Sequence, residues 1–200
     1  MRGTKSTVAD AAATDAAIEA RIVESPMGYS WYAVGPKGLL GSDLPARSRD
    51  DAIDRLRRRF PNARHSETLL PVLADDLRRF YAGEDVDFDV TLDLDGVTAF
   101  SRKIYTELRK VERGTVVTYG ELAERAGAPG AARGVGQAMA RNPLPPIVPC
   151  HRVIASDGTI GGFSAVGGTN VKERLLALEG APKVRIPKRK APAVAARDAT

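Results

Sequence analysis

The chain has 200 residues, with 30 Lys and Arg against 25 Asp and Glu and a formal net charge of +5. Hydrophobic residues make up 43% of it, which suits one large or two small globular domains. Its single cysteine excludes an internal disulfide, and one cysteine with two histidines cannot supply a four-ligand thiolate metal site. Residues 1–20 lack the apolar run of a signal peptide and no stretch approaches a membrane span, so we expect a cytoplasmic protein without a membrane partner.

Charge is distributed unevenly along the chain. Residues 21–98 carry 11 basic and 14 acidic groups (−3), whereas residues 99–182 carry 11 and 7 (+4). The tail 183–200 holds six basic residues and one acid (+5). A basic second half predicts contact with a polyanion, while the tail alone is explained equally well as a solvated, disordered end.

The first half predicts strands followed by helices. Residues 1–20 are rich in Ala and lack apolar periodicity, which is typical of a disordered tail. Between Arg21 and Leu44, β-branched and aromatic residues alternate with turn signals, which predicts two or three short antiparallel strands. Asp50 can cap a first helix that continues to Phe60. The apolar spacing of a second helix is set by Leu70, Leu73, Leu77 and Phe80.

The connection to the second half alternates apolar and acidic residues over Val86–Leu94, as an edge strand or an extended linker would. An amphipathic helix from Phe100 to Val111 follows, with Gly114 as its stop. The run TYGE, Thr118–Glu121, fits a capping box that opens a short helix. A glycine-rich break then precedes another helical segment, Ala131–Asn142, which gives the spacing of a helix-turn-helix. A second box at Asn170 and Glu173 is expected to open the last helix.

Small residues dominate Ala131–Asn142. Its interior glycines, Gly134 and Gly136, each cost about 1 kcal/mol of helix stability relative to alanine. Close approach of a partner backbone could compensate for this cost, and so could tight packing on neighbouring helices. Arg133, near the start of the segment, favours the first interpretation because a recognition helix contacts DNA there.

The only cysteine, Cys150, follows three prolines, and Pro149 directly precedes it. These prolines exclude a helix and predict an extended, stiff segment. A lone cysteine is ordinarily inert, but here His151 supplies a base and Arg152 a positive charge. Neighbouring side chains of a strand point to opposite faces, so either the chain turns at this point or a water bridges thiol and imidazole. Residue order alone leaves Glu173 and Glu179 as alternatives for the group that orients the imidazole.

The motif PCHRV at 149–153 resembles the active site of the O6-alkylguanine-DNA alkyltransferases, the methylated-DNA–protein-cysteine methyltransferases. Residues 118–164 are similar to that family nearly throughout, and weaker similarity extends to about residues 21–180. The resemblance implies an α+β fold: a small ribonuclease-H-like N-terminal domain (21–95) before a mainly helical, winged helix-turn-helix domain (96–182) for DNA binding and alkyl transfer. The basic tail, 183–200, lies outside it.

The activity that this resemblance implies is direct-reversal DNA repair. The Cys150 thiolate would take a methyl or other alkyl group from O6 of guanine, and also from O4 of thymine, in duplex DNA. The base would be flipped out through the minor groove. Because the thioether product is not reversed, one molecule repairs one lesion and needs no cofactor. A monomer is expected, with cooperative assembly on DNA left open.

The resemblance also assigns catalytic roles. His151 matches the base that acts through a water, and Glu179 the carboxylate that orients it. Tyr119 matches the hydroxyl that assists base extrusion and donates to the guanine, and Asn142 matches the hinge before the active-site segment. Arg152 is expected to form a structural salt bridge.

Further positions match contacts with DNA and the extruded base. Arg133 matches the arginine finger that fills the gap in the base stack. The DNA-facing positions are Ala132, Arg133, Gly136 and Tyr119. The positions that match the substrate pocket are Met139, Val153, Phe163 and Ser164.

The chain departs from the family at Phe163, where tyrosine is common, and over residues 161–170, which are glycine-rich and longer than usual, so tolerance for bulky adducts is left open. The ligands of the structural zinc found in some relatives are missing, so no metal is expected, and His65 is expected at the surface. The sequence disfavours three rival functions. Cys150 argues against a non-catalytic alkyltransferase-like protein. A helix-turn-helix regulator would carry a second, cysteine-rich domain, and a hydrolase is disfavoured because adjacent Cys and His form a poor nucleophile–base pair.

Overall fold

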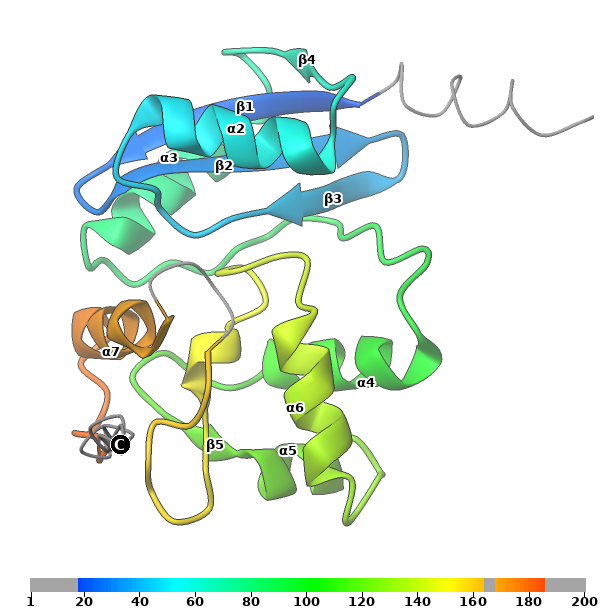
Figure 1. The fold of residues 1–200 in the computed structure, drawn as a ribbon, viewed down its shortest axis with the longest axis vertical. Coiled ribbons are helices and arrows are strands. Elements are labelled where there is room, and N and C mark those ends of the chain that lie inside the picture. The colour runs from blue at the N-terminus through cyan, green and yellow to red at the C-terminus, as the bar shows by residue number, and fades with distance from the viewer. Residues whose placement is uncertain (1–17, 164–167, 186–200) are drawn as a thin grey trace, which may run out of the picture.

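The computed structural model describes residues 18–163 and 168–185, and over these the protein is a mixed α+β structure (Figure 1). A four-stranded sheet with its helices forms one part, and helices packed around a two-stranded sheet form the other. Within the described ranges, every helix is too short or too polar to cross a bilayer. The predicted N-terminal tail, apart from residues 18–20, lies outside the described residues, as does most of the basic C-terminal one.

The large sheet has the strand order β3-β2-β1-β4: β1 (Glu19–Ser25), β2 (Gly28–Gly35), β3 (Gly38–Ser42) and β4 (Arg64–His65). The first three strands pair antiparallel, as the turn signals predict, and β4 pairs parallel with β1. The turn between β1 and β2 requires Gly28, whose φ is 118°. A Cβ at that position would lie 2.2 Å from the carbonyl oxygen of Ala46. No other residue fits there without backbone movement.

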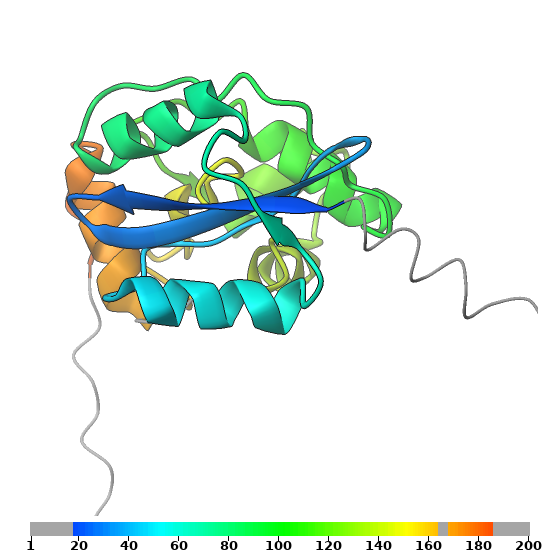
Figure 2. The same ribbon diagram turned by 90° about the horizontal axis from the view of Figure 1, so that it is seen from above.

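Helices α2 (Arg49–Arg59) and α3 (Pro71–Tyr81) cover opposite faces of this sheet (Figure 2). The strand period of two explains how both faces are apolar. Ile22 and Trp31 belong to the cluster under α2, together with Ala52 and Leu56 of that helix. Their chain neighbours in the strands point the other way and join the larger cluster: Val23 and Tyr32.

Two helix starts differ from the prediction. Ser48, not Asp50, caps α2, and its hydroxyl accepts from the amide of Asp51 at 3.2 Å. Asp50 instead lies in the first turn, where a carboxylate favours the helix dipole. Leu70 precedes α3 with a left-handed φ of 35° and is 39% exposed, so it is not part of the helix's apolar face. Pro71, which is preorganised for a first helical position, begins the helix.

The acidic segment Val86–Leu94 is an extended connection rather than a full strand. Only Leu92 forms a bridge, with Leu39 of β3. The amide of Leu39 donates to the carbonyl of Thr91 at 2.9 Å, and the amide of Asp93 to the carbonyl of Leu39 at 2.9 Å. The linker therefore runs along the edge of the sheet before the second half begins.

The second half contains α4 (Ala99–Leu108), β5 (Val117–Thr118), α5 (Tyr119–Arg125), α6 (Ala132–Ala140), the 3-10 turn η1 (Cys150–Arg152), β6 (Val153–Ile154) and α7 (Gly168–Leu178). The predicted capping box opens α5: the Glu121 amide donates to the Thr118 hydroxyl at 3.2 Å, and the Thr118 amide donates to the Glu121 carboxylate at 2.7 Å. Helix α7 starts at Gly168, so Asn170 lies inside it and the predicted second box does not begin the helix.

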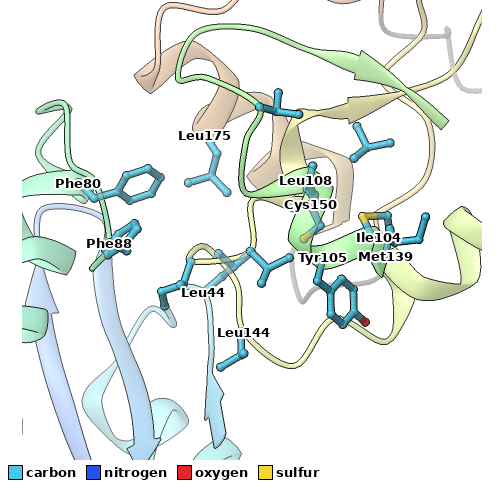
Figure 3. Close-up of a cluster of buried hydrophobic side chains, with 14 of the residues drawn as sticks. Leu44, Phe80, Phe88, Ile104, Tyr105, Leu108, Met139, Leu144, Cys150 and Leu175 are labelled. Atoms are coloured by element: carbon cyan, nitrogen blue, oxygen red, sulfur yellow. The ribbon is translucent and has the colours of Figure 1, made fainter. Parts of the chain in front are cut away.

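One hydrophobic cluster joins the two halves (Figure 3). Leu44, Phe80 and Phe88 contribute from the first half, and Ile104 and Leu175 from the second. The parallel pair β5–β6 then brings the turn that carries Cys150 beside the start of α5. The core thus fixes the position of the cysteine relative to both halves.

Candidate active site

The cysteine lies at a cavity of about 430 Å³ between α5, α6 and the turn η1. Its lining includes Tyr119 of α5, Gly136 and Met139 of α6, Cys150, and Phe163. Cys150 itself is 7% exposed and packs among the core side chains in Figure 3. Five of the positions predicted from the resemblance therefore meet at one pocket.

The segment before the cysteine turns instead of remaining extended. The Arg152 amide donates to the Pro149 carbonyl at 2.9 Å, and the Val153 amide donates to the Cys150 carbonyl, which closes the 3-10 turn. Pro149 excludes an α-helix but tolerates this tight turn, because a proline can precede the first hydrogen bond. The chain therefore turns at Cys150 and His151, and this turn is compatible with a water that bridges thiol and imidazole.

Asn142, just after α6, bonds to this segment through both its side-chain nitrogen and its side-chain oxygen. Its side-chain amide donates to the carbonyl of Val148 at 2.7 Å, and its side-chain oxygen accepts from the amide of Leu144 at 3.0 Å. Two bonds from one side chain fix the course of the chain between the helix and Cys150. Asn142 thus connects α6 with the active-site segment, and its role as a hinge stays a prediction.

A buried ionic cluster lies behind the cysteine. His151 Nε2 and Glu179 Oε1 are 2.8 Å apart, and both side chains are almost completely buried. Arg152 donates to both carboxylate oxygens of Glu179, from Nε at 3.0 Å and from the terminal nitrogen at 2.8 Å. Glu173, in contrast, is exposed on α7. The structure therefore selects Glu179 as the partner of the imidazole, and Arg152 forms the expected salt bridge.

Two opposing effects set the protonation of this cluster. Burial alone would raise the pKa of Glu179, but hydrogen bonds and charges from His151 and Arg152 outweigh it and lower that pKa to about 2. Burial lowers the pKa of His151, although Glu179 acts in the opposite direction. At neutral pH the carboxylate is thus ionised and the imidazole is neutral.

The thiol is protonated in the free protein. Burial raises the pKa of Cys150, while a hydrogen bond with Asn142 and the charge of Lys172 act to lower it. The sequence interpretation assumes an ionised sulfur, but here the neutral thiol is the stable form. Reaction at this sulfur therefore requires a group that accepts its proton.

Lys172 is a member of the site that the sequence interpretation missed. Its side chain is fully buried, and Nζ donates to the carbonyl of Val153 at 2.5 Å. Burial lowers the pKa of Lys172 to about 8, with Cys150 acting in the opposite direction. The available signal was helical spacing, since Lys172 shares one buried face of α7 with Leu175 and Leu176, and the buried Glu179 follows directly after the helix.

The glycines of α6 have different roles. A Cβ on Gly134 would lie 3.2 Å from the ring of Phe100 on α4, so this position follows the tight-packing alternative. A Cβ on Gly136 would meet only Tyr119, at 4.0 Å, and Gly136 lines the cavity. Arg133 is exposed at the start of the helix, and Ala132 beside it is half-buried.

The remaining predicted positions differ in where they lie relative to the cavity. Val153 is buried, and its carbonyl already accepts from Lys172. Phe163 lines the cavity, but Ser164 lies outside the described residues. His65 is exposed, with Nε2 2.8 Å from Glu67. In the part of the chain that the structure describes, no group of three His, Cys, Asp or Glu residues could hold a metal ion.

Known proteins resemble the chain over most of its length. A family model described as the DNA-binding domain of 6-O-methylguanine DNA methyltransferase matches residues 99–181. A methylated-DNA–protein-cysteine methyltransferase of Mycolicibacterium paratuberculosis is 37% identical over 169 residues, which are 81% of this chain and 92% of that protein. One from Methanothermobacter thermautotrophicus is 40% identical over 124 residues, 62% of this chain and 68% of that protein.

Solved structures of proteins with related names are also similar to this chain. The crystal structure of Mycobacterium tuberculosis OGT in complex with DNA has a TM-score of 0.67 and 36% identity, and the match covers 82% of this chain and 95% of that one. The O6-methylguanine-DNA methyltransferase of Pyrococcus kodakaraensis has a TM-score of 0.63 and 29% identity, with 82% and 99% coverage. The mixed α+β fold is therefore common to these proteins and this chain.

Proposed function

We propose a reaction for this chain on the premise that it belongs to the methylated-DNA–protein-cysteine methyltransferase family, as a relative that is 37% identical and matched over 92% of its length establishes. The chain repairs alkylated DNA by moving the alkyl group to a cysteine of its own. That cysteine is Cys150, the only one in the sequence. The observation that carries the proposal is its placement at a cavity with a buried His–Glu pair behind it.

The reaction is a displacement at the alkyl carbon. Sγ of Cys150 forms a bond to that carbon as the bond from carbon to O6 of guanine breaks, and the electron pair remains on the base. A thioether does not return to the thiol, so each molecule reacts once. Because burial raises the pKa of the thiol, its proton must leave during the attack.

His151 is the proposed proton acceptor, acting through a water. Its Nε2–H donates to the ionised Glu179, which leaves Nδ1 as the basic atom of a neutral imidazole. After the proton arrives, Glu179 stabilises the imidazolium. Arg152 keeps the carboxylate in place with its two hydrogen bonds.

Tyr119 is the proposed donor to the guanine as negative charge develops on it. Burial and the nearby Cys150 raise the pKa of Tyr119, so its hydroxyl keeps its proton at neutral pH. The position of Tyr119 at the first turn of α5, fixed by the Thr118 capping box, supports this role. The carbonyl of Val153 would recognise the exocyclic amine with its second lone pair, since Lys172 uses the first.

DNA binding is proposed for α5 and α6, which form the helix-turn-helix of a winged domain. The small residues Ala132 and Gly136 would permit close approach to the minor groove. Arg133, exposed at the start of α6, would fill the base stack after the nucleotide is flipped into the cavity. A flipped O4-alkylthymine would enter the cavity in the same way. The protein would act on DNA as a monomer.

Two domains are proposed on either side of the extended linker, residues 21–95 with a ribonuclease-H-like arrangement and residues 96–182 for DNA binding and alkyl transfer. The four-stranded sheet with helices on both faces supports the first assignment. The cluster of side chains shared by both halves means that they would fold as one cooperative unit.

The experiment is a stoichiometric assay with duplex oligonucleotide containing O6-methylguanine in excess. We expect guanine to be restored in a burst equal to one equivalent of protein, with no further reaction. Cys150→Ser, which is close in size, should produce no burst. Continued turnover, or a burst in the Cys150→Ser variant, would contradict the proposal.

A further inference from the structure

A second cavity, of about 310 Å³, adjoins the one described above. Met139, Cys150 and Phe163 line both. We call this second cavity the distal cleft. Because the reactive sulfur lies where the two meet, a substituent too large for the first cavity has the distal cleft as its continuation.

The far wall of the distal cleft comes from the first half of the chain. Trp31 of β2 and Asp43, just after β3, line it together with Arg55 and Arg59 of α2. The two arginines are four residues apart, so their side chains lie on the same face of the helix. The cleft therefore combines an aromatic ring with one acidic and two basic side chains.

The charge of Arg55 is already matched. Its guanidinium donates to both carboxylate oxygens of Asp51, at 3.1 and 2.6 Å. It also lies 3.6 Å from a carboxylate oxygen of Asp43. Asp43 in turn accepts from the amide of Leu44 at 2.8 Å. These contacts leave Arg55 little capacity for a further anion.

Arg59 differs from Arg55 because it has no carboxylate partner within salt-bridge distance among the described residues. Its guanidinium donates to the carbonyls of Pro143, at 3.0 Å, and Leu40, at 3.5 Å. It is held 5.8 Å from the centre of the Trp31 ring. Arg59 is exposed at the mouth of the cleft, but partial burial still lowers its pKa, and the attraction of Asp43 does not offset this effect. Arg59 is thus a fixed cation with donors to spare.

We propose that the distal cleft binds the far end of long O6 substituents and that Arg59 selects those that end in a carboxylate. This inference rests on the proposed alkyl transfer to Cys150. A carboxylate can accept two parallel hydrogen bonds from one guanidinium, and an arginine already held by two backbone carbonyls loses little freedom in forming them. The carboxylate of Asp43, on the same wall, repels an anion from its own position, so a bound carboxylate is directed toward Arg59.

The chemistry at the reacting carbon is unchanged. The sulfur–carbon bond forms, the carbon–O6 bond breaks, and the thiol proton passes to His151, so the distal carboxylate takes no part in the bond changes. Its effect is on binding and orientation before the displacement. A charge-assisted hydrogen bond of this kind, partly desolvated, corresponds to about a tenfold preference.

The test uses two forms of O6-benzylguanine, one with a carboxylate and one with an uncharged carboxamide at the para position of the ring. The second-order rate of protein alkylation is followed by intact mass. We expect the carboxylate to react about tenfold faster than the carboxamide, because the two differ mainly in charge. Arg59→Gln should bring the ratio of the two rates close to one. Arg58→Gln, an exposed neighbour on the same helix, should leave the ratio unchanged.

The ratio separates this proposal from the proposed function. If O6-methylguanine DNA and both probes fail to alkylate the wild-type protein, alkyl transfer itself is refuted. If they react but carboxylate and carboxamide do so equally fast, only the distal subsite is refuted. A preference that persists in Arg59→Gln would also overturn it.

Discussion

The two halves of the molecule bury very different side chains. Around the large sheet, nearly all buried side chains are apolar, and the charged residues of α2 remain at the surface or in the distal cleft. Behind the cysteine, the second half buries His151, Lys172 and Glu179. Buried charges stabilise a fold less than apolar residues of the same size would. The comparison indicates that the first half provides a rigid support and the second half a site whose protonation is controlled.

The largest expected effect follows from removing the carboxylate of the buried cluster. Glu179→Ala leaves His151 and Arg152 without their shared partner, and breaking a buried pair costs about 3–5 kcal/mol. Chemical denaturation should show this loss, and alkyl transfer should fall sharply in the folded fraction. Glu173→Ala, at an exposed position of the preceding helix α7, should change the free energy of unfolding by less than about 0.5 kcal/mol. Equal effects of the two substitutions would contradict the assignment of Glu179 as the shared partner of His151 and Arg152.

The lowered pKa of Glu179 predicts a loss of stability in acid. Its folded pKa is about 2, below the ordinary value of 4.5, so its contribution is complete above pH 4.5 and is lost as the pH falls toward 2. The difference corresponds to about 3 kcal/mol. Wild type should therefore lose more stability than Glu179→Gln over this window when unfolding is measured as a function of pH. Parallel curves would mean that the pKa of Glu179 is not depressed.

The lowered pKa of Lys172 predicts a gain of stability in alkali. Its folded pKa of about 8 lies below the ordinary 10.5, so the unfolded chain binds more protons between these values. Folding stability from this group therefore rises as the pH rises from 8 to 10.5. Burial raises the pKa of Cys150, so the contribution of the thiol to stability falls as the pH rises. The contribution of Lys172 is therefore isolated as the difference between wild type and Lys172→Met. We expect that difference to grow with pH. A difference that does not change with pH would contradict the lowered pKa of Lys172.

A smaller effect is expected where the first half holds the active-site loop. The hydroxyl of Ser42 donates to the Pro145 carbonyl at 2.8 Å, and its amide donates to the Pro143 carbonyl at 3.1 Å. Ser42→Ala should cost about 1 kcal/mol and also slow alkyl transfer, because the segment before Cys150 is loosened. Ser48→Ala, which removes the cap of α2, should cost a similar amount without slowing the transfer. If Ser42→Ala and Ser48→Ala lose equal stability and transfer the alkyl group equally fast, the segment before Cys150 is held by other contacts.

The smallest effect concerns the helix of small residues. Gly136→Ala adds a methyl group that meets nothing closer than 4.0 Å, so it should stabilise α6 by about 0.5–1 kcal/mol. The same methyl group narrows the cavity and the surface proposed to meet DNA. We therefore expect higher thermal stability together with slower repair of duplex DNA. Unchanged repair would argue against close approach at this position.

Most of the fold was predictable from local patterns. The three antiparallel strands follow from alternation and glycine turns, and the capping box at Thr118 from a four-residue motif. The helix starts at Asp50 and Asn170 were wrong because a better-placed cap, Ser48, or an earlier start, Gly168, was available. Such choices among neighbouring residues differ by only about 1 kcal/mol.

The site was predictable only in part, for reasons of long-range packing. The motif around Cys150 identifies it and His151, but spacing alone could not decide between Glu173 and Glu179. The choice depends on which residues of α7 and of the turn that follows it are buried. Lys172 was missed because a lysine on a buried face is unusual, and its contact with the Val153 carbonyl joins distant segments. The distal cleft is formed by both halves, so no local pattern could reveal it.

The most direct test is to locate the transferred group in the protein after incubation with duplex DNA that carries O6-methylguanine. Peptide mass spectrometry should find one added methyl group, on the peptide that contains Cys150, in every reacted molecule. A methyl group on another residue, or an unmodified Cys150 beside repaired DNA, would contradict the account.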